Sequence, residues 1–429
     1  MRRFQALIEA NKSGKNSGIY AICSAHPWVL EASIRYAKQE NTLLLIEATA
    51  NQVNQFGGYT GMRPADFIAK VEEMADELGF DKQLLIFGGD HLGPVCWTSE
   101  NSQAAMAKAC DLVAEYVKAG FKKVHLDASM PCADDPDALS DDIVADRAAL
   151  LCQTAEAAAI ATFGRSDIVY VIGTEVPPPG GADEQIDSLQ PTCQVAAQET
   201  LACHRELFAN KGLTDAWQRV VAMVVQPGVE FDNTQVFDYK PNEASALKDF
   251  IRTVDRIAFE AHSTDYQTAG AYQSLVADHF AILKVGPELT FALREGLFAL
   301  HHIEKQLLPD VHSQFIEVVD EVMLAEPTSW QRFYHGESQQ LRFLRQFSFS
   351  DRIRYYWHQE AVQKALATML ENLARQTLPL PLISQYFPEL YQQVRRGEIE
   401  RDAKALVIAK IQRVVARYSN ACFAMEKAS

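Results

Sequence analysis

Short apolar runs alternate with longer amphipathic stretches along the chain as far as Leu300. Each apolar run is rich in β-branched or aliphatic residues and has the length of a buried β-strand. We therefore expect one strand at each run. The runs are Ile19–Ser24, Leu43–Glu47, Leu84–Phe87, Lys123–Leu126, Ile168–Ile172, Val220–Val225, Arg256–Glu260 and Phe280–Val285.

The stretches between the runs show the apolar spacing of amphipathic helices, and several end at a glycine, which commonly stops a helix. The clearest are Pro64–Leu78, Asn101–Ala119, Asp141–Phe163 and Cys193–Asn210. Strands that alternate with helices predict a parallel sheet. Eight such units match the size of an α/β fold of the closed (β/α)8 type, the TIM barrel. A doubly wound open sheet is the alternative, because strand order cannot be read from sequence.

The alternation stops after Leu300, and the remaining sequence is rich in Leu, Gln, Arg and aromatic residues. We therefore predict a barrel over residues 1–307 and a helical C-terminal extension over 308–429 that packs on it. Proline lacks a backbone donor and disfavours helix interiors. The proline-rich segment 379–388 (PLPLISQYFP) is thus expected to connect two helices.

Composition and charge narrow the classes of partner. The formal net charge is −16, and an acidic surface repels the phosphate backbone of nucleic acids, so no nucleic-acid partner is expected. A small phosphorylated ligand stays compatible with this charge, because glycine loops and helix N-termini bind phosphate locally. No apolar run approaches the roughly 20 residues that span a bilayer, so no membrane association is expected. Eight cysteines without a CxxC pair predict reduced thiols and a cytoplasmic protein.

Polar residues follow every predicted strand. In a TIM barrel the carboxyl ends of the strands form the active site, and polar groups are costly to bury without partners. We therefore predict a polar pocket at one end of the barrel. The residues singled out there are Glu47, Asn51, Asp90, His91, Asp127, Glu175, Gln226, His262, Ser263, Thr264 and Lys284.

A divalent metal is the first chemistry that this set suggests. His91, Glu175 and His262 provide two imidazoles and a carboxylate, which suit zinc or another divalent ion. Gln226 could add a weaker oxygen ligand, and Asp90 would lie beside the metal. A metal that polarises a carbonyl next to a carboxylate that moves a proton predicts aldol cleavage, epimerisation or isomerisation. A metal-free hydrogen-bond network is the alternative, and His125, inside a predicted strand, is interpreted as a buried structural histidine.

Other residues of the set are assigned to catalysis or to substrate binding. The candidate catalytic carboxylates are Asp90, Asp127 and Glu175. Glycine-rich loops and hydroxyl groups can hold a phosphate through backbone amides. The candidates for binding substrate or its phosphate are Gly180, Gly181, Gly228, Ser263, Thr264, Glu47, Asn51 and Lys284. The glycines of GGDHLGP (88–94) are expected to turn the strand end into the pocket.

Several longer motifs resemble one known family. They are CSAHP, IEATANQVNQFGGYTGM, GGDHLGP, HLDASM, VIGTEVPPPGG, VVQPGVEFD, FEAHSTDYQT and HFAILKVGPELTFALRE, with SDRIRYYW and PLISQYFP in the extension. They are similar to the GatZ/KbaZ family, the Z subunits of D-tagatose-1,6-bisphosphate aldolase. The opening stretch NSGIYAICSAHPWVLEASIRYA is closer to the KbaZ members, which are linked to N-acetylgalactosamine or galactosamine breakdown.

The resemblance implies a TIM barrel and a role in tagatose 6-phosphate degradation, in the galactitol or N-acetylgalactosamine pathway. It also implies that the chain is an accessory partner that supports the stability and full activity of a separate Y subunit, a class II zinc aldolase. A fainter similarity connects Asp90-His91 and His262-Ser263-Thr264 with the class II aldolases themselves. In place of a further zinc histidine this chain has Gln226, which weakens the expectation of tight zinc binding.

Three classes of function remain open: an accessory subunit, a metal-dependent ketose-phosphate 4-epimerase or aldolase, and a sugar-phosphate sensor without turnover. Some proteins that resemble the family are described as ketose-phosphate 4-epimerases. The aromatic residues Tyr355, Tyr356 and Trp357 of the extension are candidates for contact with the Y subunit. Their alternative role is to pack the extension onto the barrel. Assembly into a homo-oligomer is also compatible with the sequence.

Overall fold

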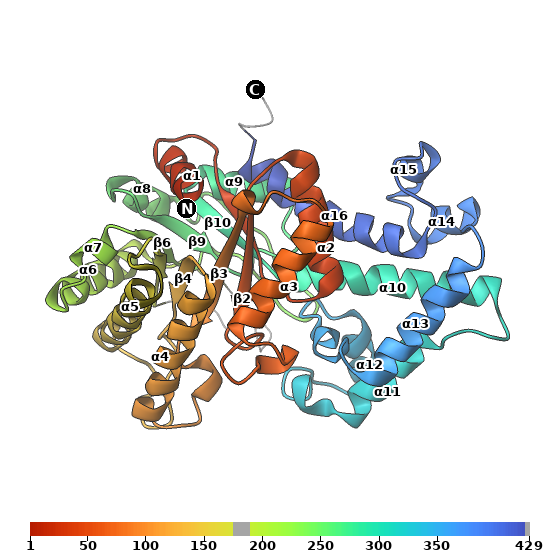
Figure 1. The fold of residues 1–429 in the computed structure, drawn as a ribbon, viewed down its shortest axis with the longest axis horizontal. Coiled ribbons are helices and arrows are strands. Elements are labelled where there is room, and N and C mark those ends of the chain that lie inside the picture. Colours follow the sequence, from red (N-terminus) through yellow and green to blue (C-terminus); the bar gives the residue numbers. More distant parts are fainter. Residues whose placement is uncertain (175–188, 425–429) are drawn as a thin grey trace.

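The computed structural model describes residues 1–174 and 189–424, and its central feature is a closed parallel barrel (Figure 1). The strands follow each other around the barrel in the order β1-β10-β9-β6-β5-β4-β3-β2. The predicted TIM barrel is therefore confirmed and the open sheet is excluded. The barrel strands are β1 (Ile19–Ile22), β2 (Leu44–Thr49), β3 (Leu85–Leu92), β4 (Lys123–Leu126), β5 (Val169–Ile172), β6 (Val220–Val224), β9 (Ala258–Ala261) and β10 (Phe280–Val285).

Helices cover the outside of the barrel, as the amphipathic spacing predicts. Their ends follow from local chemistry: the Asn101 side chain accepts the backbone N–H of Ala104, and Gly120 ends the same helix with a left-handed φ of 117°. The helices of this part are α1 (Arg2–Lys12), α2 (Pro27–Glu40), α3 (Pro64–Glu77), α4 (Ser102–Ala119), α5 (Asp141–Phe163), α6 (Gln194–Asn210), α7 (Thr214–Trp217), α8 (Ser245–Thr253) and α9 (Ala269–Ala277).

Shorter elements fill the connections. A small antiparallel hairpin, β7 (Glu230–Phe231) with β8 (Val236–Phe237), lies between β6 and β9 along the chain. The short 3-10 helices are η1 (Gly58–Thr60), η2 (Lys82–Leu84), η3 (Pro94–Trp97), η4 (Pro327–Ser329) and η5 (Arg352–Tyr356).

Strand β3 differs from its prediction, because it continues through GGDHL to Leu92 instead of ending at Phe87. The glycines therefore do not turn the chain. A Cβ atom on Gly88 would lie 2.8 Å from Cγ of Glu47. The glycine therefore leaves room for the Glu47 side chain on the neighbouring strand. The irregularity comes later, where His91 has a φ of 50° and the pairing with β4 shifts register between Gly89 and Leu92.

The extension is helical, as predicted, but segment 379–388 is not only a connection. It contains α14, in which Pro381 occupies the first turn, where a missing N–H removes no intrahelical bond. The last barrel strand is followed by α10 (Pro287–Leu307). The helices of the extension are α11 (Phe315–Ala325), α12 (Ser338–Phe347), α13 (Glu360–Ala374), α14 (Leu380–Tyr386), α15 (Tyr391–Arg395) and α16 (Ala403–Cys422).

The last helix, α16, returns to the barrel and packs against α2, α9 and β1 (Figure 1). The N–H of Gly18 donates to the carbonyl of Cys422 at 2.9 Å, and the Tyr418 hydroxyl lies 3.1 Å from the hydroxyl of Thr264. Helix α16 therefore belongs to the outer layer of the barrel, although it follows the rest of the extension in sequence. In the part of the chain that is described, no helix is long and apolar enough to cross a membrane.

Candidate active site

A cavity of about 410 Å³ lies at the carboxyl ends of the barrel strands. Its volume is within the range of about 300–1,000 Å³ typical of small-molecule sites. Barrel residues such as Asp90, His91 and Lys284 line its base, and Arg354 and Trp357 line it from the extension. The extension thus covers the mouth of the barrel, a feature that the sequence does not reveal.

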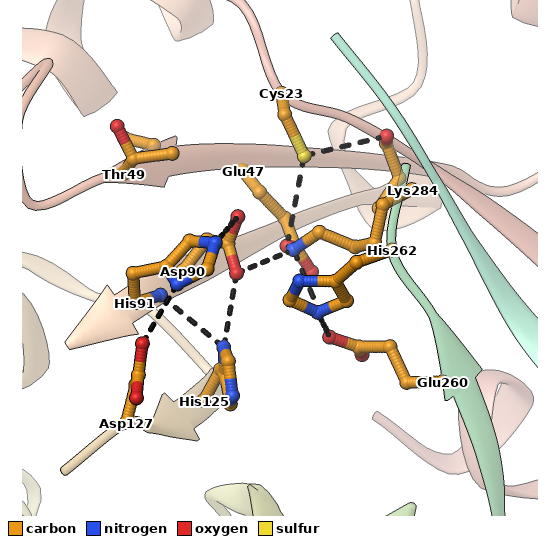
Figure 2. A network of polar contacts seen from close by, with 12 residues as sticks. Cys23, Glu47, Thr49, Asp90, His91, His125, Asp127, Glu260, His262 and Lys284 are labelled. Atoms are coloured by element: carbon orange, nitrogen blue, oxygen red, sulfur yellow. Dashed lines mark hydrogen bonds and ion pairs between the residues drawn. The ribbon is translucent and has the colours of Figure 1, made fainter. Parts of the chain in front are cut away.

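Two buried lysines hold three buried carboxylates together at the base of the cavity. Nζ of Lys123 lies 2.7 Å from a carboxylate oxygen of Glu47 and 2.7 Å from one of Glu260, and all three side chains are fully buried. Nζ of Lys284 contacts Glu47, lies 2.7 Å from Asp90 and lies 3.7 Å from Glu260 (Figure 2). Each buried charge therefore has opposite charges beside it, as low-dielectric surroundings require.

The ion pairs fix the charge state of this array. Burial alone would raise the pKa of Glu260, but Lys123 and Lys284 outweigh it and hold the pKa well below its usual range. Burial alone would lower the pKa of Lys284, but Asp90 and the other anions raise it well above its usual range. Lys284 therefore remains an ammonium group and is not available as a Schiff-base nucleophile.

Three histidine rings meet above the charged array. The ring centroids of His91 and His125 are 5.3 Å apart, and each lies 5.1 Å from the ring of His262. Three imidazoles that share one tetrahedral zinc ion at about 2.1 Å per Zn–N bond have centroids roughly 5 Å apart. The spacing of the rings therefore fits a three-histidine metal site.

Carboxylates behind two of these rings strengthen the fit. Nδ1 of His91 lies 2.7 Å from Asp127, and Nε2 of His262 lies 3.0 Å from Glu260. A carboxylate on the far nitrogen is the usual arrangement behind a metal-binding histidine, because it orients the ring. The remaining nitrogen of each ring is then available for an ion.

His125 and Asp90 provide further metal-binding atoms. The backbone N–H of His91 donates to Nδ1 of His125 at 3.3 Å, and an oxygen of Asp90 lies 3.1 Å from the same nitrogen. The contact between Nδ1 of His125 and the Asp90 carboxylate is a hydrogen bond when that nitrogen carries the proton. Ligand atoms of Asp90, His125, Glu260 and His262 all lie within 4.8 Å of one another, in a group to which His91 does not belong. A second group comprises Cys23, Glu47 and Asp90.

The protonation states of His262 and Asp90 suit metal binding, whereas that of His91 favours the imidazolium. Burial lowers the pKa of His262 to about 4, so its imidazole is neutral at pH 7, as a metal ligand must be. Burial alone would raise the pKa of Asp90, but His91 and Lys284 outweigh it and keep this carboxylate ionised. Burial alone would lower the pKa of His91, but Asp90 and Asp127 raise it.

The structure brings many of the predicted residues together and separates others. Glu47, Asp90, His91, Asp127, His262 and Lys284 belong to the network of Figure 2, while Asn51 and Ser263 line the cavity. Gln226 is occupied in a turn, where its Oε1 accepts the N–H groups of Gly228 and Val229. The Thr264 hydroxyl donates to the backbone oxygen of Lys284 at 2.6 Å and is buried. Glu175, Gly180 and Gly181 lie outside the described residues.

Among the charged and imidazole side chains of the network, Lys123, His125 and Glu260 are absent from the predicted site. His125 is buried, as predicted, and its Nδ1 is hydrogen-bonded, but its buried Nε2 has no hydrogen-bond partner in residues 1–174 and 189–424. The signal for all three was the two-residue period of a strand. Lys123 and His125 share a face with Asp127, and Glu260 shares one with His262.

The aromatic residues of the extension are mostly internal. Tyr356 and Trp357 are only 2% and 4% exposed, so they pack the extension and are not exposed contact residues. The packing alternative is the one that the structure supports for them. Tyr355 lies edge-on to Tyr59 from the barrel, with ring centroids 5.0 Å apart.

One solved structure shares this architecture, and two more distant ones are similar to parts of it. A probable tagatose 6-phosphate kinase from Sinorhizobium meliloti is 45% identical, with a TM-score of 0.87 over 94% of this chain and 100% of its own. The fructuronate-tagaturonate epimerase UxaE from Cohnella laeviribosi is 13% identical, with a TM-score of 0.49 over 94% and 81%. A fructose-bisphosphate aldolase from Campylobacter jejuni is 14% identical, with a TM-score of 0.44 over 86% and 91%.

A family model gives the broader assignment. The model for D-tagatose-1,6-bisphosphate aldolase subunits of the GatZ/KbaZ-like type matches residues 4–423. That match extends from α1 to the end of α16 and so includes both the barrel and the extension. The chain therefore belongs to the GatZ/KbaZ-like family of D-tagatose-1,6-bisphosphate aldolase subunits.

Proposed function

We propose that this chain is itself a metal-dependent enzyme that breaks and re-forms a carbon–carbon bond of a phosphorylated ketose, as an aldolase or a 4-epimerase. The observation that carries the proposal is the convergence of three imidazoles and the Asp90 carboxylate beneath a substrate-sized cavity. Burying such an array of charges costs desolvation free energy, and buried ion pairs seldom add net stability to the fold. The array therefore points to a role in function. Perturbed groups in a cleft are typical of active sites.

Each side chain has a role in this proposal. His91, His125 and His262 would hold a divalent ion, zinc foremost, with Asp127 and Glu260 orienting two of the rings. When bound, the ion would withdraw electrons from the substrate carbonyl and so favour cleavage of the neighbouring carbon–carbon bond. Asp90 is ionised and lines the cavity, so it can accept the hydroxyl proton whose loss starts cleavage, and return it. Lys284 holds Asp90 in place.

The other predicted site residues complete the proposal. Glu175 is retained as a further ligand or proton-transfer group, and Gln226 as a weak ligand that would first have to leave its turn. Asn51 and Ser263 line the cavity and would contact the substrate, while the buried Glu47 would act through Lys284, which it holds. Gly180, Gly181, Gly228 and Thr264 are candidates for phosphate binding from the sequence alone.

The decisive experiment supplies Zn²⁺, Mn²⁺ or Co²⁺ to the purified chain and follows two reactions. These are cleavage of D-tagatose 1,6-bisphosphate and 4-epimerisation of D-tagatose 6-phosphate. Asp90→Asn should lower turnover at least 100-fold with metal still bound, and His262→Ala should lose both metal and turnover. A wild-type protein that binds none of the three metals and turns over neither substrate would refute the proposal.

A second candidate function follows from the family assignment, whose description is that of an aldolase subunit. In that role the chain would stabilise a class II Y subunit in the cytoplasm, in galactitol or N-acetylgalactosamine breakdown. Co-purification and light scattering at micromolar concentration test the complex. If Asp90→Asn supports the Y subunit as well as wild type does, the accessory role is independent of the barrel chemistry. A kinase role like the one in the name of the Sinorhizobium relative is not proposed, because the chain has no Walker A motif.

A further inference from the structure

Two cations face the cavity from its outer wall. They are Arg354 of η5, in the extension, and Lys70 of α3. We propose that these two residues bind the phosphate group of the substrate, so that the helical extension provides the phosphate site. This inference takes a ketose as the substrate from the proposed function. It adds a separate claim, namely which residues bind the phosphate group of a phosphorylated ketose.

The charge environment of the cavity singles out this pair. Among the described residues, Lys70, Lys284 and Arg354 are the lysines and arginines that line the cavity. The Lys284 ammonium group already pairs with the carboxylates of the buried array, so its charge is neutralised within the protein. The segment 175–188 contains no lysine or arginine in its sequence, so it adds no competing cation.

Neither of the two outer cations forms an ion pair within the described part of the protein, and Asp351 attracts Arg354 only from a greater distance. No carboxylate oxygen of residues 1–174 or 189–424 lies within 4.0 Å of the Lys70 ammonium or the Arg354 guanidinium. The chain carries 56 acidic residues and 40 basic ones. Carboxylates are therefore in excess, and a cation without a carboxylate partner is unexpected. Two half-buried cations without one, on the same cavity, indicate a site for an anionic group.

Arg354 is held in a fixed position. Its Nη1 donates to the backbone oxygens of Ser350 and Asp351, and its Nη2 donates to the Tyr355 hydroxyl at 3.0 Å. A guanidinium group has five N–H donors, so Nε and the second hydrogen of Nη2 remain for a ligand. A planar group that is already ordered loses little entropy when it binds phosphate.

The usual phosphate position of a TIM barrel is filled by the protein itself. That position lies near the loops after the last two strands and a helix N-terminus. Here an oxygen of Asp265 accepts the N–H of Gly286 at 3.0 Å and the N–H of Glu288 at 2.8 Å, at the start of α10. A phosphate there would displace one carboxylate and approach that of Glu288, so the opposite wall is the favourable place.

The metal-binding residues and the two cations then define the two ends of one cavity. His91 and His262 line its base in the barrel, and Arg354 and Lys70 lie on walls formed by the extension and by α3. A ketose whose carbonyl faces the base would extend its phosphate towards them. This arrangement explains why the extension, which holds no residue of the metal cluster, is nevertheless part of the site.

The test compares the binding of D-tagatose 6-phosphate and D-tagatose by calorimetry, with Zn²⁺-loaded full-length protein. Wild type should bind the phosphate ester at least tenfold more tightly than the sugar. Arg354→Gln and Lys70→Met should each reduce that preference at least fivefold and leave the affinity for D-tagatose unchanged. Lys364→Gln, an exposed cation of α13 outside the cavity, is the matched control and should keep the full preference.

The outcomes separate this inference from the proposed catalysis. If phosphate preference depends on Arg354 or Lys70 but no turnover is found, the phosphate site stands and the catalytic proposal fails. If turnover is found but both variants keep the preference, or lose affinity for both ligands alike, the phosphate site is overturned. Thermal unfolding checks each variant, and should Arg354→Gln not fold, the half-exposed Lys70 decides the matter alone.

Discussion

Lys123 shows at the scale of one residue how the site is built. Its ammonium group is fully buried and bridges Glu47 of β2 and Glu260 of β9. The barrel interior thus contains charges where most barrels of this type contain branched aliphatic side chains. Replacing such charges with apolar groups often costs nothing in stability, whereas removing one partner leaves an unpaired charge.

We predict that Lys123→Met is strongly destabilising. The two carboxylates that it leaves behind would be buried without this counter-ion, which costs about 3–5 kcal/mol. Urea unfolding measures the loss. Lys118→Met is the control, since its pair with Glu115 is about half exposed, and exposed pairs contribute at most about 1 kcal/mol. Equal, small losses in both variants would mean that the buried array is not a coupled unit.

Asp351 should make stability depend on pH. Burial raises the pKa of Asp351 to about 7, against the attraction of Arg294, while the unfolded value is about 3.9. The folded state therefore holds the proton more tightly, so the stability from this group is present below pH 4 and is lost as the pH rises towards 7. Asp351→Asn cannot ionise, and asparagine tolerates the left-handed φ of 46° found there.

The Asp351→Asn protein should therefore gain stability relative to wild type between pH 5 and pH 8. Urea unfolding of both proteins at the two pH values gives the difference directly, and other titrating groups cancel in it. A difference that stays constant with pH, or that falls, would show that Asp351 is already ionised at pH 5.

At the scale of elements, β3 and β4 approach so closely at Gly93 that no side chain fits. A Cβ atom there would lie 1.5 Å from the carbonyl oxygen of Asp127, and the N–H of Asp127 already donates to Leu92. This contact places Asp127 behind His91. The spacing of the two strands therefore controls the orientation of a candidate metal ligand.

Gly93→Ala should disrupt both the fold and the site. The backbone of β3 or β4 would have to move, because carbonyl oxygens cannot shift as a flexible side chain can. We expect a loss of at least about 2–3 kcal/mol in the free energy of unfolding, typical of overpacking, together with weaker metal binding. Gly270→Ala in α9 is the control, since nothing lies within 4 Å of its added Cβ. A Gly93→Ala protein as stable as the control would contradict the described spacing.

At the scale of the whole molecule, the barrel and the extension are joined by α16. Its Tyr418 is fully buried, lies 4.1 Å from the ring of Tyr272 in α9 and reaches Thr264 through its hydroxyl. An ion pair adds to this contact, since Arg417 of α16 pairs with the buried Glu288 at the start of α10. We therefore expect the chain to lose its structure in one step and not to shed the last helix first.

The matched pair Tyr418→Phe and Tyr418→Ala tests this expectation. Loss of the hydroxyl alone should cost about 0.5–1.5 kcal/mol, the net value of one hydrogen bond. Loss of the ring should cost about 3–5 kcal/mol, as for other large aromatic truncations in a core. Chemical unfolding followed by tryptophan fluorescence and circular dichroism gives both values. Non-coincident transitions in wild type would show that α16 unfolds separately.

The sequence allows the barrel and part of its site to be predicted, for definable reasons. Alternating strands and helices leave a strong pattern, and Asp90, His91 and His262 stand out because they follow apolar runs. Lys123, His125 and Glu260 do not stand out in the sequence. Each is a single polar residue inside an apolar run, and its role becomes clear only when the residues on the neighbouring strands are known. Arg354 could not be placed at all, since its distance to Tyr59 is set by tertiary packing across about 300 residues.

The position of α16 also has a consequence for protein synthesis. Strand β1 is among the first elements to leave the ribosome, but the helix that covers it follows about 380 residues later. At a translation rate of about 5–20 residues per second, β1 is synthesised roughly 20–80 seconds before the helix that packs on it. During that time its apolar surface is open to chaperones and to aggregation. A nascent chain should therefore acquire metal and substrate affinity only after residues 403–422 have emerged.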